Sequence, residues 1–271
     1  MNFLFQEGIK KVLDYKFKKH GIRIMLYFVL LLISLIMLMF TTSSEIIYGR
    51  KMGYLICGLD VYNFMMMYTY YNLFVTIIIY IFYVSFILKK CSDAFIIAHG
   101  SYKKYYIYLL KVALVDAIIV TLIEGVATFI STRVYNLNQN NWDLLVSKYN
   151  YLNGNTIEIN GHIIIGTFII AIFLWNLWIR IFMNSIYYIT RNKLTTVFIG
   201  IGVYLLFSRV GIINVLPYIT YEGWENEGNI YAFIPMLIAY IVLIVFSFCF
   251  RTINKKVRIN EILYKRNKKS K

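Results

Sequence analysis

The sequence contains few of the residues on which soluble domains and disulfide frameworks depend. Charged side chains make up only 15% of its 271 residues, against about 25% in a typical soluble domain. Two prolines and 15 glycines exclude a collagen-like or low-complexity chain. The three cysteines, Cys57, Cys91 and Cys249, have no spacing typical of a disulfide framework or a metal site. No stretch of the chain has the polarity of a soluble domain.

Catalytic and nucleotide-binding motifs are also missing. The sequence has no G-x-x-x-x-G-K-[ST] loop to cradle a nucleoside triphosphate, and neither H-E-x-x-H nor G-x-S-x-G occurs in it. The histidines, His20, His99 and His162, lie far apart in the sequence. We therefore expect no catalytic residue, cofactor site or metal site in this chain, and an enzyme is the least favoured class.

What the sequence does contain is long hydrophobic runs. Hydrophobic residues make up 60% of the chain, and its mean hydropathy is +0.64. About 20 mainly apolar residues suffice for a helix to cross a bilayer. The sequence therefore predicts an all-α polytopic membrane protein, a single transmembrane domain over residues 1–271. The six predicted spans cover residues 24–43, 66–88, 106–130, 162–187, 194–215 and 231–250.

Residues 52–67 are also apolar, but Gly53, Gly58 and Asp60 interrupt them. We interpret this segment as an outer loop.

The distribution of Lys and Arg predicts the orientation. With both termini inside, 21 of the 28 basic residues fall in cytoplasmic segments, including the basic tail 251–271, and only five fall outside. Cytoplasmic loops retain such an excess of Lys and Arg. Because the basic ends face anionic membrane lipid, we expect no nucleic-acid partner. Richness in Ile, Lys, Asn and Tyr indicates an AT-rich bacterial genome, and hence a multi-pass protein of a bacterial plasma membrane.

The N-terminal stretch 2–20 has the pattern of an amphipathic helix that precedes the first span. Its apolar residues share one helical face, Lys10, Lys11, Asp14 and Lys18 occupy the other, and Gly21 is a natural stop. This pattern predicts a helix that lies in the membrane interface, or else a simple topological anchor. The residues of the apolar face are Phe5, Ile9, Val12, Leu13 and Phe17.

The cytoplasmic loop between the second and third spans carries a second amphipathic feature. Ser92 or Asp93 can cap a short helix and Gly100 can end it. Between them lies an apolar cluster, Phe95, Ile96 and Ile97, which is costly to leave in water. This helix is suited to insertion into a groove on a partner, and the alternative is that it packs on the inner leaflet or on the chain's own helices.

This layout resembles the membrane subunits of type-2 ABC exporters. The resemblance rests on the N-terminal helix, the six spans and the stretch AFIIAHGSYKKYYIYLLK at the start of the third span. It implies a permease that pairs with a second permease subunit and binds separate ATPase subunits, which carry the ATP and magnesium. A short re-entrant outer helix of such a permease would fall within residues 211–228. The resemblance implies that the ATPase-coupling residues are Asp93, Phe95, Ile96, Ile97, His99 and Gly100.

Asp116, Glu124 and Arg180 are ionisable residues inside predicted spans, where an unpaired charge costs at least about 2.5–3.5 kcal/mol. Asp116 and Glu124 are eight residues apart in the third span and lie on roughly the same side of the helix. Arg180 lies in the fourth span, which runs antiparallel to the third, so it can reach the depth of Asp116. We expect an Asp116–Arg180 structural pair, and we expect Glu124 to line a cavity.

These features favour a permease subunit of an ATP-driven exporter that moves a hydrophobic or amphipathic substrate, such as a bacteriocin or toxin peptide. An ion-gradient-driven secondary transporter is the first alternative, although no internal repeat is visible. A membrane scaffold or sensor subunit, whose buried charges serve only assembly, is the second.

Overall fold

The computed structural model describes residues 2–67, 69–88, 102–190, 192–210, 234, 238, 241–242 and 244–249. These residues are mostly helical and contain no β-strand, so the predicted all-α class is confirmed for this part of the chain. In chain order the elements are α1 (Asn2–Met52), α2 (Gly58–Met67), α3 (Thr69–Phe82), the π-helical turn η1 (Tyr83–Ile87), α5 (Tyr102–Val134), α6 (Lys148–Asn153), α7 (Gly161–Thr190) and α8 (Lys193–Val210).

Three helices in the described part are long and apolar enough to cross a membrane. They are residues Gly21–Met52 of α1, Ile107–Val134 of α5 and Gly161–Tyr187 of α7. They correspond to the first, third and fourth predicted spans. The second predicted span contains the shorter apolar helix Phe74–Ile87, and the fifth overlaps the shorter apolar helix Lys193–Val203. Half of the sixth, residues 231–250, lies outside the described residues, so the total of six spans stays a prediction.

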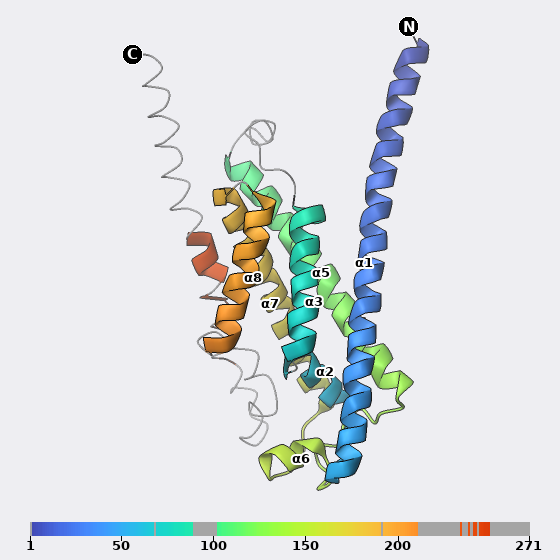
Figure 1. Ribbon diagram of the computed structural model, residues 1–271, viewed down its shortest axis with the longest axis vertical. Helices are drawn as coiled ribbons and strands as arrows, with labels where there is room; N and C mark the ends of the chain where they lie inside the picture. Colours follow the sequence, from blue (N-terminus) through green and yellow to red (C-terminus); the bar gives the residue numbers. More distant parts are fainter. Residues whose placement is uncertain are drawn as a thin grey trace.

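The long helices form a bundle in which successive neighbours pack side by side. α1 packs along α5, α5 along α7, and α7 against α8, while α3 contacts both α1 and α8 (Figure 1). α2 and α6 lie at one end of this bundle, and the first turns of α1 extend beyond the other labelled helices at the opposite end. The core is apolar over most of its length, with Phe64, Tyr83 and Phe168 among its fully buried side chains.

α1 corrects the prediction that a helix stops at Gly21. The backbone is helical from Asn2 to Met52 without interruption, and a Cβ at Gly21 would meet nothing within 4 Å. A single glycine costs only about 1 kcal/mol inside a helix, which the long helical segments on both sides outweigh. The N-terminal segment and the first span therefore form one continuous helix.

α2 corrects the interpretation of residues 52–67 as a loop, because residues 58–67 are helical and residues 58–65 are buried. Asp60 begins this helix rather than breaking it, since its carboxylate accepts hydrogen bonds from the Cys57 amide (2.7 Å) and the Trp142 indole (2.9 Å). A Cβ at Gly58 would lie 2.9 Å from Thr132 Cγ2, so glycine here permits close approach to the end of α5.

Residues 53–57 and 135–160 pack together across the α6 end of the bundle. Gly53 adopts a left-handed conformation (φ +84°) and, with Tyr54, donates its amide to the Gly49 carbonyl, which ends α1. The Leu55 amide then donates to the Val146 carbonyl, and the Leu55 carbonyl accepts from the Lys148 amide. We call these two segments the cap. The cap closes one end of the bundle with a hydrogen-bonded layer in which Tyr54, Trp142 and Tyr149 are buried.

Candidate functional site: a buried polar network between the helices

An ion pair joins α5 to α7 in the interior of the bundle. Arg180 Nε donates to Asp116 Oδ2 over 2.5 Å, and the two side chains are 0% and 2% exposed. Tyr27 of α1 donates its hydroxyl to the other oxygen, Asp116 Oδ1. Three helices therefore meet at one carboxylate, and the Asp116 charge is compensated by a cation and a hydroxyl donor.

The Arg180 guanidinium has further contacts within α7 and with η1. Its Nη1 donates to the Asn176 carbonyl (2.8 Å) and to Asn176 Oδ1 (3.1 Å), and its centre lies 5.6 Å from the centroid of the Tyr83 ring. Tyr83 in turn donates its hydroxyl to Asn184 Oδ1 (2.9 Å). Arg180 Nη2 is buried and has no hydrogen-bond partner among the described residues. The network therefore reaches from α1 through α5 and α7 to the π-helical turn, and it leaves Arg180 Nη2 without a hydrogen-bond acceptor among the described residues.

Glu124 lies two turns farther along α5 and is held differently. Its Oε2 accepts a hydrogen bond from Asn176 Nδ2 over 2.8 Å, and Asn176 Nδ2 also lies 3.3 Å from Thr121 Oγ1. Glu124 is 7% exposed and forms no ion pair with any described residue. Asn176 thus connects the Asp116–Arg180 pair to Glu124. Its two carbonyl oxygens accept hydrogen bonds from Arg180, and its side-chain NH2 group donates one to Glu124.

Polar side chains continue along the same face of α5 beyond Glu124. The Thr128 hydroxyl donates to the Glu124 carbonyl (2.9 Å), and the Ser131 hydroxyl lies 3.2 Å from that of Thr42 on α1. From Asp116 to Ser131 this face covers about 22 Å of helix at 1.5 Å per residue. These side chains face protein rather than lipid, the arrangement expected of polar groups that a membrane protein retains. The buried polar residues of this face are Asp116, Thr121, Glu124, Thr128 and Ser131.

The structure places the other residues named from the sequence as follows. The loop that contains Asp93, Phe95, Ile96, Ile97, His99 and Gly100 lies outside the described residues. Residues Phe5, Ile9, Val12, Leu13 and Phe17 fall on the helical backbone of α1, and their side chains lie outside the described part.

Sequence reasoning missed Tyr27, Asn176, Tyr83 and Asn184 as members of the network. Asn176 carried a signal, because an amide four residues before Arg180 shares its helical face inside an apolar run. Tyr27 carried no such signal, since nothing distinguishes it from the other 24 tyrosines as the contact of a residue 89 positions away.

The cap contains a second cluster of charges. Lys148 Nζ lies 2.5 Å from Glu45 Oε2 on α1, with side chains 7% and 12% exposed, and 4.5 Å from the centroid of the Phe64 ring. Tyr54 donates its hydroxyl to the same Glu45 oxygen (3.1 Å). Burial, together with the Glu45 carboxylate, raises the pKa of the Tyr54 phenol above its usual range, so it remains a donor. This pair anchors the cap to the end of α1.

Cys57 is the last residue of the first cap segment and is completely buried. Burial, and then the neighbouring Asp60 carboxylate, raises the pKa of the Cys57 thiol well above its ordinary value. Among the described residues, no three His, Cys, Asp or Glu side chains are grouped as a metal site.

Comparison with known proteins adds no assignment: no family model matches this chain, and neither a curated protein nor a solved structure shows detectable similarity to it.

Proposed function

We propose that this chain is the membrane-spanning permease subunit of an ATP-driven ABC exporter in a bacterial plasma membrane, with both termini in the cytoplasm. It pairs with a second copy or a related permease chain and binds separate ATPase subunits, which hold the ATP and magnesium. Its cargo is hydrophobic or amphipathic, and a peptide such as a bacteriocin or toxin fits best.

The observation that carries this proposal is the continuity of α5. This helix begins at Tyr102, directly after the loop 89–101, and runs unbroken to Val134. It carries Asp116 and Glu124, which contact α1 and α7 through Tyr27, Arg180 and Asn176. A helix transmits a push along its axis because its hydrogen bonds resist compression. A partner that moves the loop therefore displaces the polar network that joins three helices.

The other end of the same loop follows a π-helical turn. In η1 the Leu88 amide donates to the Tyr83 carbonyl (2.8 Å), and Lys193 Nζ at the start of α8 donates to the Ser85 carbonyl (2.8 Å). Single π-turns are frequent at functional sites because they widen a helix locally. Movement of the loop would thus also bear on Tyr83, which contacts Arg180. Both flanks of the loop lead to one buried cluster, as a coupling element requires.

The experiment is purification of the tagged full chain in mild detergent, followed by an ATPase assay on the material that copurifies. We expect a stoichiometric ATPase, and we expect Phe95→Asp to abolish its retention. The matched control is Leu145→Asp, which adds the same charge at a 79% exposed apolar residue of the cap, beyond the C-terminal end of α5. A chain that purifies alone, from membranes that support no ATP hydrolysis by the complex, contradicts the proposal.

Glu124 favours one second candidate, a carrier driven by an ion gradient. A membrane-embedded carboxylate that lacks a basic partner is a natural binding site for a proton or a cation, and Glu124 forms no ion pair among the described residues. Vesicles that contain the purified chain alone distinguish the two candidates. Uptake driven by an imposed proton or sodium gradient without ATP, and lost in Glu124→Gln, favours the carrier.

A further inference from the structure

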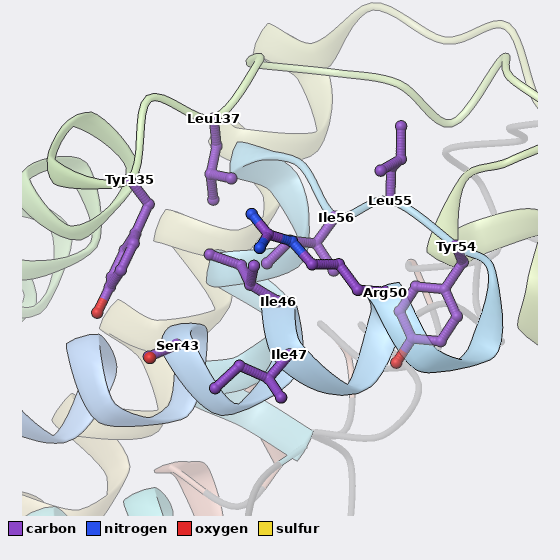
Figure 2. A pocket seen from close by; sticks show the side chains of 9 residues that line it. All are labelled: Ser43, Ile46, Ile47, Arg50, Tyr54, Leu55, Ile56, Tyr135 and Leu137. Carbon is purple, nitrogen blue, oxygen red and sulfur yellow. The ribbon is translucent and has the colours of Figure 1, made fainter.

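A pocket of about 400 Å³ lies where α1 ends against the cap (Figure 2). Ile46 and Ile47 of α1 form one side of it, Ile56 of the cap forms another, and Leu137 approaches from the segment after α5. The walls are therefore mostly apolar. Arg50, in the last turn of α1, is the single charged residue among those that line it.

The Arg50 guanidinium is available to a ligand. Figure 2 shows the Arg50 side chain extended among the lining residues, with its guanidinium turned toward Leu137. Arg50 forms no hydrogen bond or ion pair with any described residue, because the nearby carboxylate of Glu45 already pairs with Lys148 and Tyr54. A guanidinium presents two parallel N–H donors that match a phosphate or carboxylate. A ligand with an anionic group and an apolar body would pair with the Arg50 guanidinium and pack against the apolar walls of the pocket.

The two tyrosines in the walls are already engaged. Tyr135 donates its hydroxyl to the Met39 carbonyl (3.0 Å), and Tyr54 donates its hydroxyl to Glu45 (3.1 Å). These bonds fix both rings before any ligand arrives, which lowers the cost of binding. They also leave Arg50 as the main polar recognition group, so the pocket selects for negative charge rather than for a particular neutral headgroup.

The position of the pocket along α1 identifies the ligand. The apolar stretch Gly21–Met52 is long enough to cross a membrane, and Arg50 lies in its last turn, at the depth where basic side chains meet lipid phosphates. At the edge of the pocket, Ile47 and Leu55 are each 55% exposed and offer an apolar path for acyl chains. We infer that the pocket binds one anionic phospholipid, with its phosphate at Arg50 and its glycerol and upper acyl chains against Ile46 and Ile47.

The test is a titration of the detergent-purified full chain with phosphatidylglycerol, in which native mass spectrometry counts the bound lipids. We expect one tightly bound lipid in the wild type and at least about tenfold weaker binding in Arg50→Gln, the loss of hydrogen bonds to a charged group. Arg133→Gln is the matched control, since Arg133 is an exposed arginine in the last turn of α5 that does not line the pocket. Leu137→Trp, which fills the pocket and keeps Arg50, should weaken binding as much as Arg50→Gln does.

Two further arms separate specific lipid binding from other sources of the same signal. Phosphatidylcholine, whose headgroup is neutral overall, should bind at least about tenfold more weakly than phosphatidylglycerol if charge selects the ligand. Soluble glycerol 3-phosphate should fail to displace the lipid, and efficient displacement by it would show that the site takes a free phosphate instead. Equal losses in Arg50→Gln and Arg133→Gln, or full binding in Leu137→Trp, would overturn the assignment of the lipid to this pocket.

Discussion

Asp116 Oδ2 and Arg180 Nε lie 2.5 Å apart in a pair that is completely enclosed by α1, α5 and α7. Burial of two charges is costly, and their attraction repays that cost only when hydrogen bonds satisfy the remaining atoms. Here Tyr27 donates a hydrogen bond to the second oxygen of the Asp116 carboxylate, and Asn176 accepts two hydrogen bonds from Nη1 of the Arg180 guanidinium. The pair therefore ties α5 to α7, because loss of either partner would leave the other charge buried and unpaired.

The first prediction concerns this pair. Asp116→Asn leaves Arg180 charged and buried without its anion, and we expect a loss of about 3–5 kcal/mol in the free energy of unfolding. Thermal unfolding in detergent, followed by size-exclusion chromatography, measures the loss. Lys111→Gln is the control, because Lys111 lies on the same helix and is exposed. A variant Asp116→Asn that unfolds at the temperature of the control would show that the pair does not hold the helices.

The second prediction separates the role of Glu124 from that of Asp116. Glu124→Gln keeps the shape of the side chain and an acceptor for Asn176 Nδ2, and it removes no ion pair from the described network. We expect its thermal stability to stay within about 1 kcal/mol of wild type, as for the loss of one ordinary hydrogen bond. Because an unpaired carboxylate inside a span is retained for function, we expect transport to fall at least several-fold.

Measurement of both quantities on the same preparation decides this prediction. Unchanged stability with reduced transport assigns Glu124 to the translocation route. Unchanged transport removes Glu124 from that route, and a stability loss as large as that of Asp116→Asn would make it a structural residue.

The long helices could be predicted from the sequence because hydrophobicity reports them directly. The predicted spans 106–130 and 162–187 lie within α5 (Tyr102–Val134) and α7 (Gly161–Thr190). α2 could not be found in this way, since its Gly58 and Asp60 resemble loop residues until the contacts of Thr132 and Trp142 are known. Rules based on local sequence fail at α2 because a residue distant in the sequence, Trp142, donates the hydrogen bond to the Asp60 carboxylate.

The candidate site follows the same division. The depth of Asp116 and Arg180 follows from two antiparallel helices and a rise of about 1.5 Å per residue, so their proximity is visible in the sequence. The third member, Tyr27, comes from α1, and nothing in the local pattern of α1 sets its rotation about its own axis. That rotation depends on packing against α5, and it exists only in the assembled bundle.

The third prediction tests the cap through Cys57. The raised pKa of its thiol means that the thiolate, which is the reactive form, is scarcer at any given pH than for a free cysteine. In a variant with Cys91 and Cys249 replaced by Ser, we expect Cys57 to react with a maleimide far more slowly in the folded protein than in detergent-denatured protein between about pH 7 and 9. The reference pKa of a free thiol, about 8.5, lies within that range. Labelling of the folded chain at the denatured rate would mean that the packing of the cap does not bury Cys57.

The fourth prediction tests the continuity of α1 at two glycines whose surroundings differ. If α1 is helical through Gly21, where an added Cβ meets nothing within 4 Å, Gly21→Ala should stabilise the helix by about 0.5–1 kcal/mol. If a helix instead ended there with Gly21 in a left-handed conformation, alanine would be strained and would destabilise the protein. At Gly49 the opposite result is expected, because an added Cβ would lie 2.8 Å from the Tyr54 carbonyl oxygen and 2.9 Å from its ring.

The two alanine variants thus act as each other's control. Both replace a glycine of α1 with the same residue, so a difference in sign between their unfolding temperatures comes from the surroundings of the position. A rise for Gly21→Ala with a fall for Gly49→Ala supports one continuous helix that ends under the cap. A fall at Gly21 would instead restore a separate N-terminal helix, and the first turns of α1 could then lie along the membrane interface rather than extend the first span.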